Sequence, residues 1–270
     1  MSKKAILALL IAVMIPVVSY LILKAESDSA VVMPRKLLLD SVATRVENGK
    51  MIDDSIWHKT GNIRLVNQLG DTVSLYDIKG KMIVVDFFFT HCGGICPRLT
   101  KGMLKLQQSF LKGGDTRQKI DTQVVQFVSF SIDPANDSVS VLKKYADNYG
   151  ISPDNWWLLT GSRDSIGKFA FEELKVDKYS DAPINPDFVH TSRFVLLDKN
   201  YTVRGYYNGL DSTSLSKLAR DIGLLMMEKD KTKKSEVFTE IMGLGWIWAI
   251  VLVLVVAFII YFTKRRKING

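Results

Sequence analysis

The stretch MIVVDFFFTHCGGICPRL, residues 82–99, decides the fold that the sequence predicts. Met82–Phe89 is an almost continuous β-branched and aromatic run, which is typical of a strand buried on both of its faces. Proline is tolerated in the first turn of a helix, where its missing N–H costs nothing. Pro97 therefore indicates a helix that begins near Ile95 or Cys96.

The loop between this strand and this helix carries the two cysteines of the chain, Cys92 and Cys96. Gly93 and Gly94 give the loop conformational freedom, so it can fold Cys92 back over the first helical turn, close to Cys96. Both sulfurs would then lie near unpaired backbone N–H groups at the positive end of the helix. We expect that position to lower the pKa of the thiols and to favour the thiolate.

From Ile63 onward the sequence alternates between strand and helix patterns. We expect a hairpin within Ile63–Lys81, a strand over Thr122–Ile132, a helix over Ser138–Tyr149 capped by Asp137, a strand over Trp157–Leu159, a helix over Asp164–Leu174, a hairpin over Phe194–Tyr207, and a helix from a capping Asp211 to about Met226. Alternating strands and helices imply an α/β domain whose mainly parallel sheet is covered on both faces. The closing hairpin adds antiparallel edge strands.

Two uncharged apolar runs lie near the ends of the chain. Ala5–Leu23 follows Lys3 and Lys4, and Gly243–Phe262 precedes the basic residues 264–267. Each run is long enough to cross a hydrocarbon core of roughly 30 Å. Because basic flanks stay in the cytoplasm, we expect both termini there and the domain on the extracytoplasmic side of the inner membrane. A cleaved signal peptide is the alternative for the first run.

These runs divide the chain into six segments. They are an N-terminal anchor or signal sequence (1–24), a tether with an edge element (25–60), the α/β domain (61–227), a charged linker (228–241), a C-terminal transmembrane helix (242–263) and a basic tail (264–270). The net charge of +8 reflects the flanks: six of the 36 lysines and arginines lie there, which leaves 30 against 28 acidic residues. A domain with so nearly balanced a charge does not indicate a nucleic-acid-binding protein.

Three uses of the cysteine pair compete. A structural disulfide would close a very short loop and so remove little entropy from the unfolded chain. A redox dithiol fits an extracytoplasmic domain, although Cys-x-x-x-Cys departs from the usual Cys-x-x-Cys spacing. The third use is a metal site, because two thiolates suit a soft ion, above all Cu(I), especially when one imidazole is added.

The three histidines differ in how well they could supply that imidazole. His91 adjoins Cys92, and strand alternation should point its side chain away, so it is expected to be a neighbour rather than a ligand. His58 lies in the tether, where a solvated or hairpin-packing role is expected. His190 precedes the strand that begins near Arg193, and the loop before that strand can reach the cysteine junction. A lone histidine is nevertheless more often structural than a ligand.

Several segments together resemble a known family. DFFFTHCGGICP (Asp86–Pro97) resembles the signature of the Sco/SenC family of copper-binding, thioredoxin-like proteins, in which a buried strand ends in Phe-Thr-x-Cys-x-x-x-Cys-Pro. Supporting segments agree in order and spacing: VSLYDIKGKMIVVDFFFT, SFSIDPANDS (Ser129–Ser138), NWWLLTG (Asn155–Gly161) and FVHTSRFVLLDKN (Phe188–Asn200). The resemblance covers about Ile63 to Leu225.

The resemblance implies a thioredoxin-like fold, with a central mixed sheet and helices on both faces, flanked here by two transmembrane helices. It places the copper ligands on Cys92, Cys96 and His190. Asp86 and Asp133 match acids that recur in the family; a core carboxylate and a strand-end turn are their alternative interpretations. Many members have only the N-terminal anchor, so the second span is a departure.

The resemblance further implies a membrane-anchored copper chaperone that binds Cu(I), with Cu(II) binding left open, and delivers it to the dinuclear copper centre of cytochrome c oxidase. Its partners would be subunit II of the oxidase or its assembly factors, and a thiol reductant. The alternative is an enzyme, a thiol-disulfide oxidoreductase with Cys92 as nucleophile and Cys96 as resolving thiol. A third hypothesis, a peroxide-removing enzyme, lacks a lysine or arginine next to Cys92 in the sequence.

Overall fold

The structure is a computed structural model, and it describes residues 14–15, 18–20, 22, 32–47, 50–110, 124–179 and 191–228. Met33–Glu228 forms one compact unit. Among the described residues, none of the helices is both long enough and apolar enough to span a bilayer. The predicted segments 228–241, 242–263 and 264–270 lie outside the described residues except for Glu228, and segment 1–24 is described at only six positions, so both spans stay predictions.

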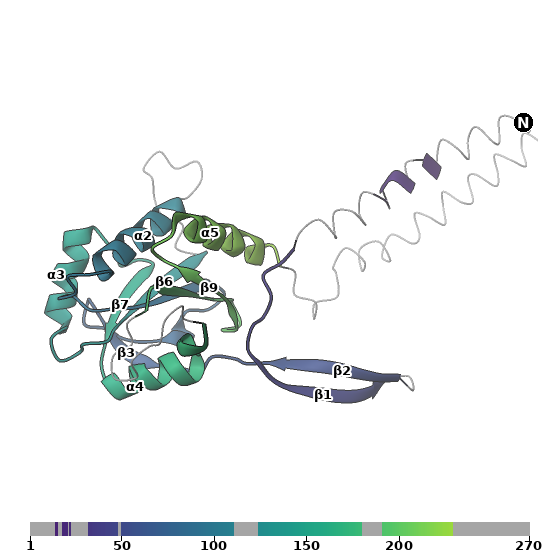
Figure 1. Cartoon of the computed structure of the whole chain (residues 1–270), viewed down its shortest axis with the longest axis horizontal. Helices are drawn as coiled ribbons and strands as arrows, with labels where there is room; N and C mark the ends of the chain where they lie inside the picture. Colours follow the sequence, from purple (N-terminus) through teal and green to yellow (C-terminus); the bar gives the residue numbers. More distant parts are fainter. Residues whose placement is uncertain are drawn as a thin grey trace, which may run out of the picture. The chain divides into compact units, whose positions relative to one another are not determined.

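Strands and helices alternate through this unit, with three short helical turns between them (Figure 1). In chain order the elements are β1 (Leu39–Glu47), β2 (Lys50–Trp57), β3 (Arg64–Asn67), β4 (Thr72–Ser74), η1 (Leu75–Asp77), β5 (Met82–Phe88), α2 (Cys96–Ser109), β6 (Val125–Ser131), α3 (Val139–Tyr149), β7 (Trp156–Thr160), α4 (Arg163–Lys168), η2 (Phe169–Glu173), η3 (Val176–Tyr179), β8 (Arg193–Leu197), β9 (Val203–Asn208) and α5 (Ser212–Met226).

The main sheet is mixed, with the strand order β4-β3-β7-β6-β5-β8-β9. β5 pairs with β6 and β6 with β7 in parallel, whereas the other neighbouring strands pair antiparallel. The prediction of a mainly parallel sheet is therefore wrong outside the three central strands. The reason is connectivity: α2 and α3 form the crossovers that parallel strands need, while the β3–β4 and β8–β9 hairpins flank them with antiparallel pairs.

β5 is buried along its whole length and separates two apolar cores. Ile83 and Phe87 belong to the core that α4 and η2 cover, and Val84 and Phe88 belong to the core that α2, α3 and α5 cover. Figure 1 shows α2 and α5 on one side of the sheet and α4 on the other. The prediction of a sheet covered by helices on both faces is confirmed.

Two of the predicted helix-end signals, Gly150 and Asp211, are confirmed. Gly150 ends α3 with φ of +68°, the left-handed conformation that favours glycine. Asp211 caps α5 by accepting hydrogen bonds from two backbone N–H groups of its first turn, at 3.3 and 2.9 Å. The helix predicted over Asp164–Leu174 is divided, since α4 passes into the wider π-helical turn η2, whose Phe169 and Ala170 are buried in the core.

β1 and β2 form a separate two-stranded antiparallel sheet, within the segment predicted as a tether with an edge element (25–60). His58 holds the base of this hairpin: its backbone N–H donates to Leu38 O at 2.8 Å, and its Nδ1 lies 3.1 Å from Asp40 Oδ1. Its Nε2 lies 3.3 Å from Glu173 Oε2, an ion-pair distance outside hydrogen-bond geometry. His58 therefore has the hairpin-packing role that was one of the two predicted for it.

Arg204 on β9 joins the two ends of the compact unit. Its side chain is 3% exposed and donates through Nη1 to Asp198 Oδ2 at 2.8 Å and to Glu228 Oε2 at 2.7 Å. Nε and Nη2 donate to the carbonyl oxygen of Pro34 at 3.1 and 2.6 Å. A buried cation is stable only when it is paired. This network therefore holds Pro34, near the start of the compact unit, and Glu228, at its end, against β9.

Two glycines allow α2 to approach the turn between β9 and α5. A Cβ on Gly102 would lie 2.9 Å from the carbonyl oxygen of Gly209. A Cβ on Gly209 would lie 2.6 Å from Phe194 Cζ and 2.7 Å from Leu99 Cδ2. Close packing leaves no room for a methyl group at either position.

We predict that Gly209→Ala lowers the free energy of unfolding by about 1–3 kcal/mol, because the added methyl group overpacks against Phe194 and Leu99. Gly167→Ala is the matched control, since a Cβ at Gly167 meets nothing within 4 Å and alanine is the better helix former. Denaturant unfolding of both variants beside the parent measures the difference. Unchanged stability of Gly209→Ala would contradict the close approach.

Candidate metal centre

The two cysteines lie where β5 passes into α2. β5 ends at Phe88 and α2 begins at Cys96, with Pro97 in its first turn, and the intervening loop carries Cys92. The predicted helix start is therefore confirmed. Ile95, the residue before the helix, offers no side-chain cap to the free N–H groups of the first turn.

The thiols of Cys92 and Cys96 are in contact. The two cysteines are not joined by a disulfide; Cys92 is half-buried, and Cys96 is 1% exposed. The Cys96 thiol is hydrogen-bonded to Cys92 and to the backbone of Phe89. The predicted return of Cys92 to the first turn of the helix is confirmed, so the two sulfurs can act on one ion or on each other.

Burial raises the pKa of the Cys96 thiol to about 12, and the hydrogen bond to Cys92 adds to that rise. The prediction that the helix terminus would lower its pKa is therefore wrong for Cys96. Desolvation of a thiolate outweighs the helix dipole where the sulfur is almost inaccessible to water. Cys96 must lose its proton before its sulfur can serve as a thiolate ligand or nucleophile.

A buried carboxylate fixes the loop that precedes Cys92. Asp137 is fully buried and accepts hydrogen bonds from the Thr90 N–H at 3.2 Å, from Thr90 Oγ1 at 2.5 Å and from Ser131 Oγ at 2.5 Å. The prediction that Asp137 caps α3 is wrong, because Ser138 occupies that cap. The parallel pairing of β5 with β6 brings their carboxyl ends together, so Asp137 can bind the loop that follows β5.

His91 and Asp133 make local contacts at the same edge of the sheet. His91 is exposed, and its Nδ1 lies 3.1 Å from Thr90 Oγ1, in keeping with the expected role of a neighbour. Asp133 Oδ2 accepts from Asn136 Nδ2 at 2.8 Å, and the Asp133 carbonyl oxygen accepts from two backbone N–H groups. Asp133 thus stabilises the turn after β6, as its alternative interpretation predicted.

Asp86 is a carboxyl group enclosed in the apolar core under α2. It lies on β5 between Val84 and Phe88 and is 2% exposed. Burial raises the pKa of Asp86 to about 7, and a hydrogen bond with Ser129 partly offsets the rise. Ser129 Oγ also accepts from Trp156 Nε1 at 2.9 Å. Asp86 Oδ1 has no hydrogen-bond partner in the part of the chain that the structure describes.

The third predicted ligand, His190, lies outside the described residues. Its described neighbour Thr191 is buried and accepts a hydrogen bond from the Arg193 N–H at 3.1 Å. β8 is antiparallel to β5, with Val195 opposite Val85, so the start of β8 borders the end of β5. Across residues 32–228, leaving the masked gaps aside, no three His, Cys, Asp or Glu side chains could together hold a metal. The full ligand set stays a prediction.

Known proteins share this domain. A sequence model of the family described as SCO1/SenC matches residues 57–226. The SCO1 protein homolog of Bacillus subtilis is 35% identical over 176 residues, which cover 64% of this chain and 86% of that relative. The match to the family begins at the end of β2, so the β1–β2 hairpin precedes it.

Two solved structures share the fold. A SCO1/SenC family lipoprotein from Bacillus anthracis is 35% identical, with a TM-score of 0.51 over 63% of this chain and 95% of its own. BsSco, a member of the Sco family of cytochrome c oxidase assembly proteins in which a disulfide switch is identified, is 34% identical, with a TM-score of 0.52 over 65% and 98%. The likeness confirms the thioredoxin-like fold with a central mixed sheet.

We predict that Asp137→Asn lowers the free energy of unfolding by about 2 kcal/mol or more, because three donated hydrogen bonds lose a charged acceptor. It should also speed the alkylation of Cys92, since Thr90 is no longer held. Denaturant unfolding and alkylation kinetics of the reduced protein measure both effects. Asp154→Asn, in the exposed turn before β7, is the control. If Cys92 of Asp137→Asn is alkylated at the rate of the parent, Asp137 does not hold the loop.

We predict that replacing Asp86 by Asn stabilises the protein in a pH-dependent way. The pKa of Asp86 is about 7 in the folded chain against an ordinary value of 3.8, so at low pH, where the carboxyl is protonated in both states, it adds no pH-dependent cost. The cost grows as the pH rises from about 4 to about 7, because over this range the carboxyl is ionised in the unfolded chain but still protonated in the folded one. Above this range both states are ionised and the cost is constant. The stability of Asp86→Asn relative to the parent should therefore rise by a few kcal/mol over this range, as denaturant titrations at several pH values will show. A pH-independent difference would disprove the raised pKa.

Proposed function

Because the chain belongs to the SCO1/SenC family, we propose that it is a membrane-anchored copper chaperone for cytochrome c oxidase. The observation that carries the proposal is the pair of reduced, hydrogen-bonded thiols of Cys92 and Cys96 at the junction of β5 and α2. BsSco, the relative with the same fold, belongs to a family of cytochrome c oxidase assembly proteins, which supports the same role here.

Copper is the cargo of this site. Two thiolates are soft ligands and suit Cu(I) better than harder ions. Copper must displace the proton that Cys96 holds with a pKa of about 12, so copper and protons compete and the affinity for Cu(I) rises with pH. Oxidation of Cys92 and Cys96 to a disulfide removes both thiolates, so binding requires the reduced pair.

The third ligand in this proposal is the imidazole of His190. Two observations support it. The dipeptide His190-Thr191 matches the distal His-Thr or His-Ser of the family signature, to which the sequence is similar. Thr191 stands two residues before β8, whose start borders the end of β5 and the cysteine loop. A neutral imidazole would complete a three-coordinate Cu(I) site with no change in charge.

Delivery proceeds by ligand exchange. A thiolate of the acceptor joins the bound Cu(I), and one of the three original ligands then leaves, so the ion is never released to water. Cys92 is the more exposed sulfur and therefore the natural point of entry. The acceptor is the dinuclear copper centre of oxidase subunit II. Spans 1–24 and 242–263, with both termini in the cytoplasm, would confine chaperone and acceptor to one face of the inner membrane and raise their effective concentration.

The second candidate function is that of a thiol-disulfide oxidoreductase, which the unequal exposure of the two thiols favours. The Cys92 thiolate attacks a disulfide of the target and releases one target thiolate. The Cys96 thiolate then attacks the Cys92 sulfur, which frees the second target thiolate and leaves a Cys92–Cys96 disulfide. A thiol reductant restores the pair.

We predict that His190→Ala weakens Cu(I) binding at least tenfold and leaves dithiol exchange largely intact, because it removes one ligand but neither sulfur. The full-length reduced protein is titrated anaerobically with Cu(I) against a competing chelator, beside an exchange assay with a small disulfide. The parent should retain about one Cu(I) per chain, as a site with one set of three ligands requires.

His91→Ala is the matched control, because His91 is exposed beside the same loop and should leave the Cu(I) affinity unchanged. Cys92→Ser should abolish both activities. A parent protein that loses its copper to the chelator would rule out the chaperone function, whereas equal affinities of His190→Ala and the parent would rule out His190 alone.

A further inference from the structure

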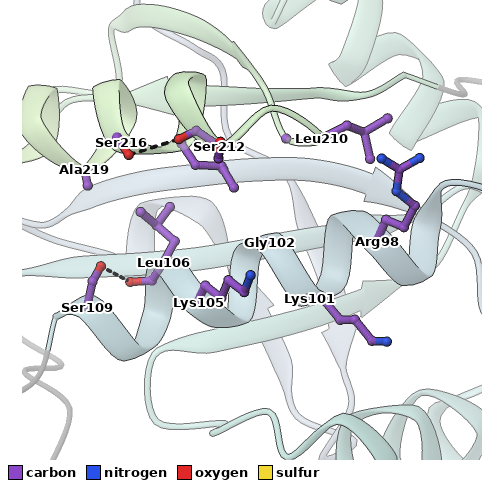
Figure 2. A pocket seen from close by; sticks show the side chains of 12 residues that line it. Arg98, Lys101, Gly102, Lys105, Leu106, Ser109, Leu210, Ser212, Ser216 and Ala219 are labelled. Atoms are coloured by element: carbon purple, nitrogen blue, oxygen red, sulfur yellow. Dashed lines mark hydrogen bonds between the residues drawn. The ribbon is translucent and has the colours of Figure 1, made fainter.

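A groove of about 460 Å³ lies between α2 and α5 (Figure 2). Neither cysteine lines it. Its apolar lining consists of Leu106, Leu210, Leu215 and Ala219. Gly102 and Gly209 also line it, at the point where α2 meets the turn that precedes α5. The floor of the α2–α5 groove is formed where α2 packs closely against the turn before α5, the contact that leaves no room for a side chain at Gly102 or Gly209. The groove is therefore a consequence of the packing of the fold.

One wall of the α2–α5 groove carries three cationic side chains. Arg98, Lys101 and Lys105 are exposed and lie at helical spacing along α2, as Figure 2 shows. In the part of the chain that the structure describes, none of the three forms an ion pair or hydrogen bond, and no carboxylate lines the groove. An uncompensated row of cations beside a concave surface attracts anionic partners.

Two of the three serine hydroxyl groups that line the groove are already engaged. Ser109 Oγ donates to Leu106 O at 2.6 Å, and Ser216 Oγ donates to Ser212 O at 3.0 Å, so both hydrogens point into their own helices. Polar recognition therefore falls to the three cations and the Ser212 hydroxyl. An apolar floor beside a cationic wall is complementary to an amphipathic segment with one apolar and one acidic side.

The groove begins close to the thiols. α2 starts at Cys96, so Arg98 lies in its first turn, and Lys105 lies about 10 Å further along the helix axis. A partner seated in the groove would therefore lie beside the loop that carries Cys92.

We propose that the α2–α5 groove docks an acidic, amphipathic segment of the protein that accepts copper from this chain, an inference that rests on the chaperone function proposed above. Carboxylates of the partner pair with Arg98, Lys101 and Lys105, and its apolar side chains enter between the helices. A single phosphate could not contact three cations spread over about 10 Å. A flat bilayer surface could not fill a concave groove, so a protein segment fits best.

The test is the transfer of Cu(I) from the full-length chain in detergent to the reduced, copper-free soluble domain of oxidase subunit II. Copper in the acceptor is quantified after rapid separation. Lys101→Glu with Lys105→Glu should slow transfer about tenfold or more at low salt, because reversed charges oppose encounter. The difference should shrink as salt screens the charges. Lys101→Gln with Lys105→Gln should fall between this variant and the parent.

Lys144→Glu with Lys168→Glu is the matched control, since both lysines are exposed on other helices and the change in net charge is the same. All variants should keep the Cu(I) affinity of the parent. If the parent transfers copper and the groove and control variants transfer it equally fast, the docking proposal is wrong and the chaperone function stands.

If the parent holds or transfers no Cu(I), the proposed function fails, and direct binding of the same acceptor domain to the immobilised full-length chain decides the docking proposal. Weaker binding by the Lys101→Glu, Lys105→Glu variant than by the control supports docking, and equal binding overturns it. Loss of binding to phosphatidylglycerol vesicles with unchanged binding of the acceptor would assign the groove to the membrane and also overturn the proposal.

Discussion

The parallel pairing of β5 with β6 is the constraint on which the candidate site depends. Seven consecutive pairs, from Met82 with Val125 to Phe88 with Ser131, hold the two strands in register. Their carboxyl ends therefore reach the same edge of the sheet, where one strand leads into the cysteine loop and the other into Asp137. The Asp137 carboxylate accepts hydrogen bonds both from Ser131, at the end of β6, and from Thr90, in the cysteine loop. The register of the two strands therefore sets the position of the loop.

The fold was predictable wherever one residue has one dominant local effect. Pro97, Gly150 and Asp211 mark helix ends through backbone chemistry that depends little on distant contacts. The β1–β2 hairpin was missed because most side chains on both of its faces are exposed, so hydrophobic alternation carries little signal. Asn48-Gly49 in the sequence between the strands is the signal that could have revealed it.

The meeting of the two cysteines was predictable, but the electrostatics around them were not. Cys92 and Cys96 meet because a short loop and a helix start are local features. The pKa of Cys96 depends on how deeply α2 packs against the sheet, which residue spacing does not reveal. Asp137 was misassigned because its partner Thr90 is 47 positions away. A polar residue that follows a buried strand parallel to the cysteine strand is the signal that could have found it.

The network of Arg204 holds the two ends of the compact unit at the end of the sheet opposite to the thiols. Arg204 lies at the start of β9, beside the end of β8, and the end of β8 pairs with the beginning of β5. The cysteine loop lies at the other end of β5, about 20 Å away along seven residues of strand. Pro34 and Glu228, where the chain enters and leaves this unit, are thus joined at the end of the sheet opposite to the sulfurs, so strain at either connection reaches the cysteine loop only through the length of β5.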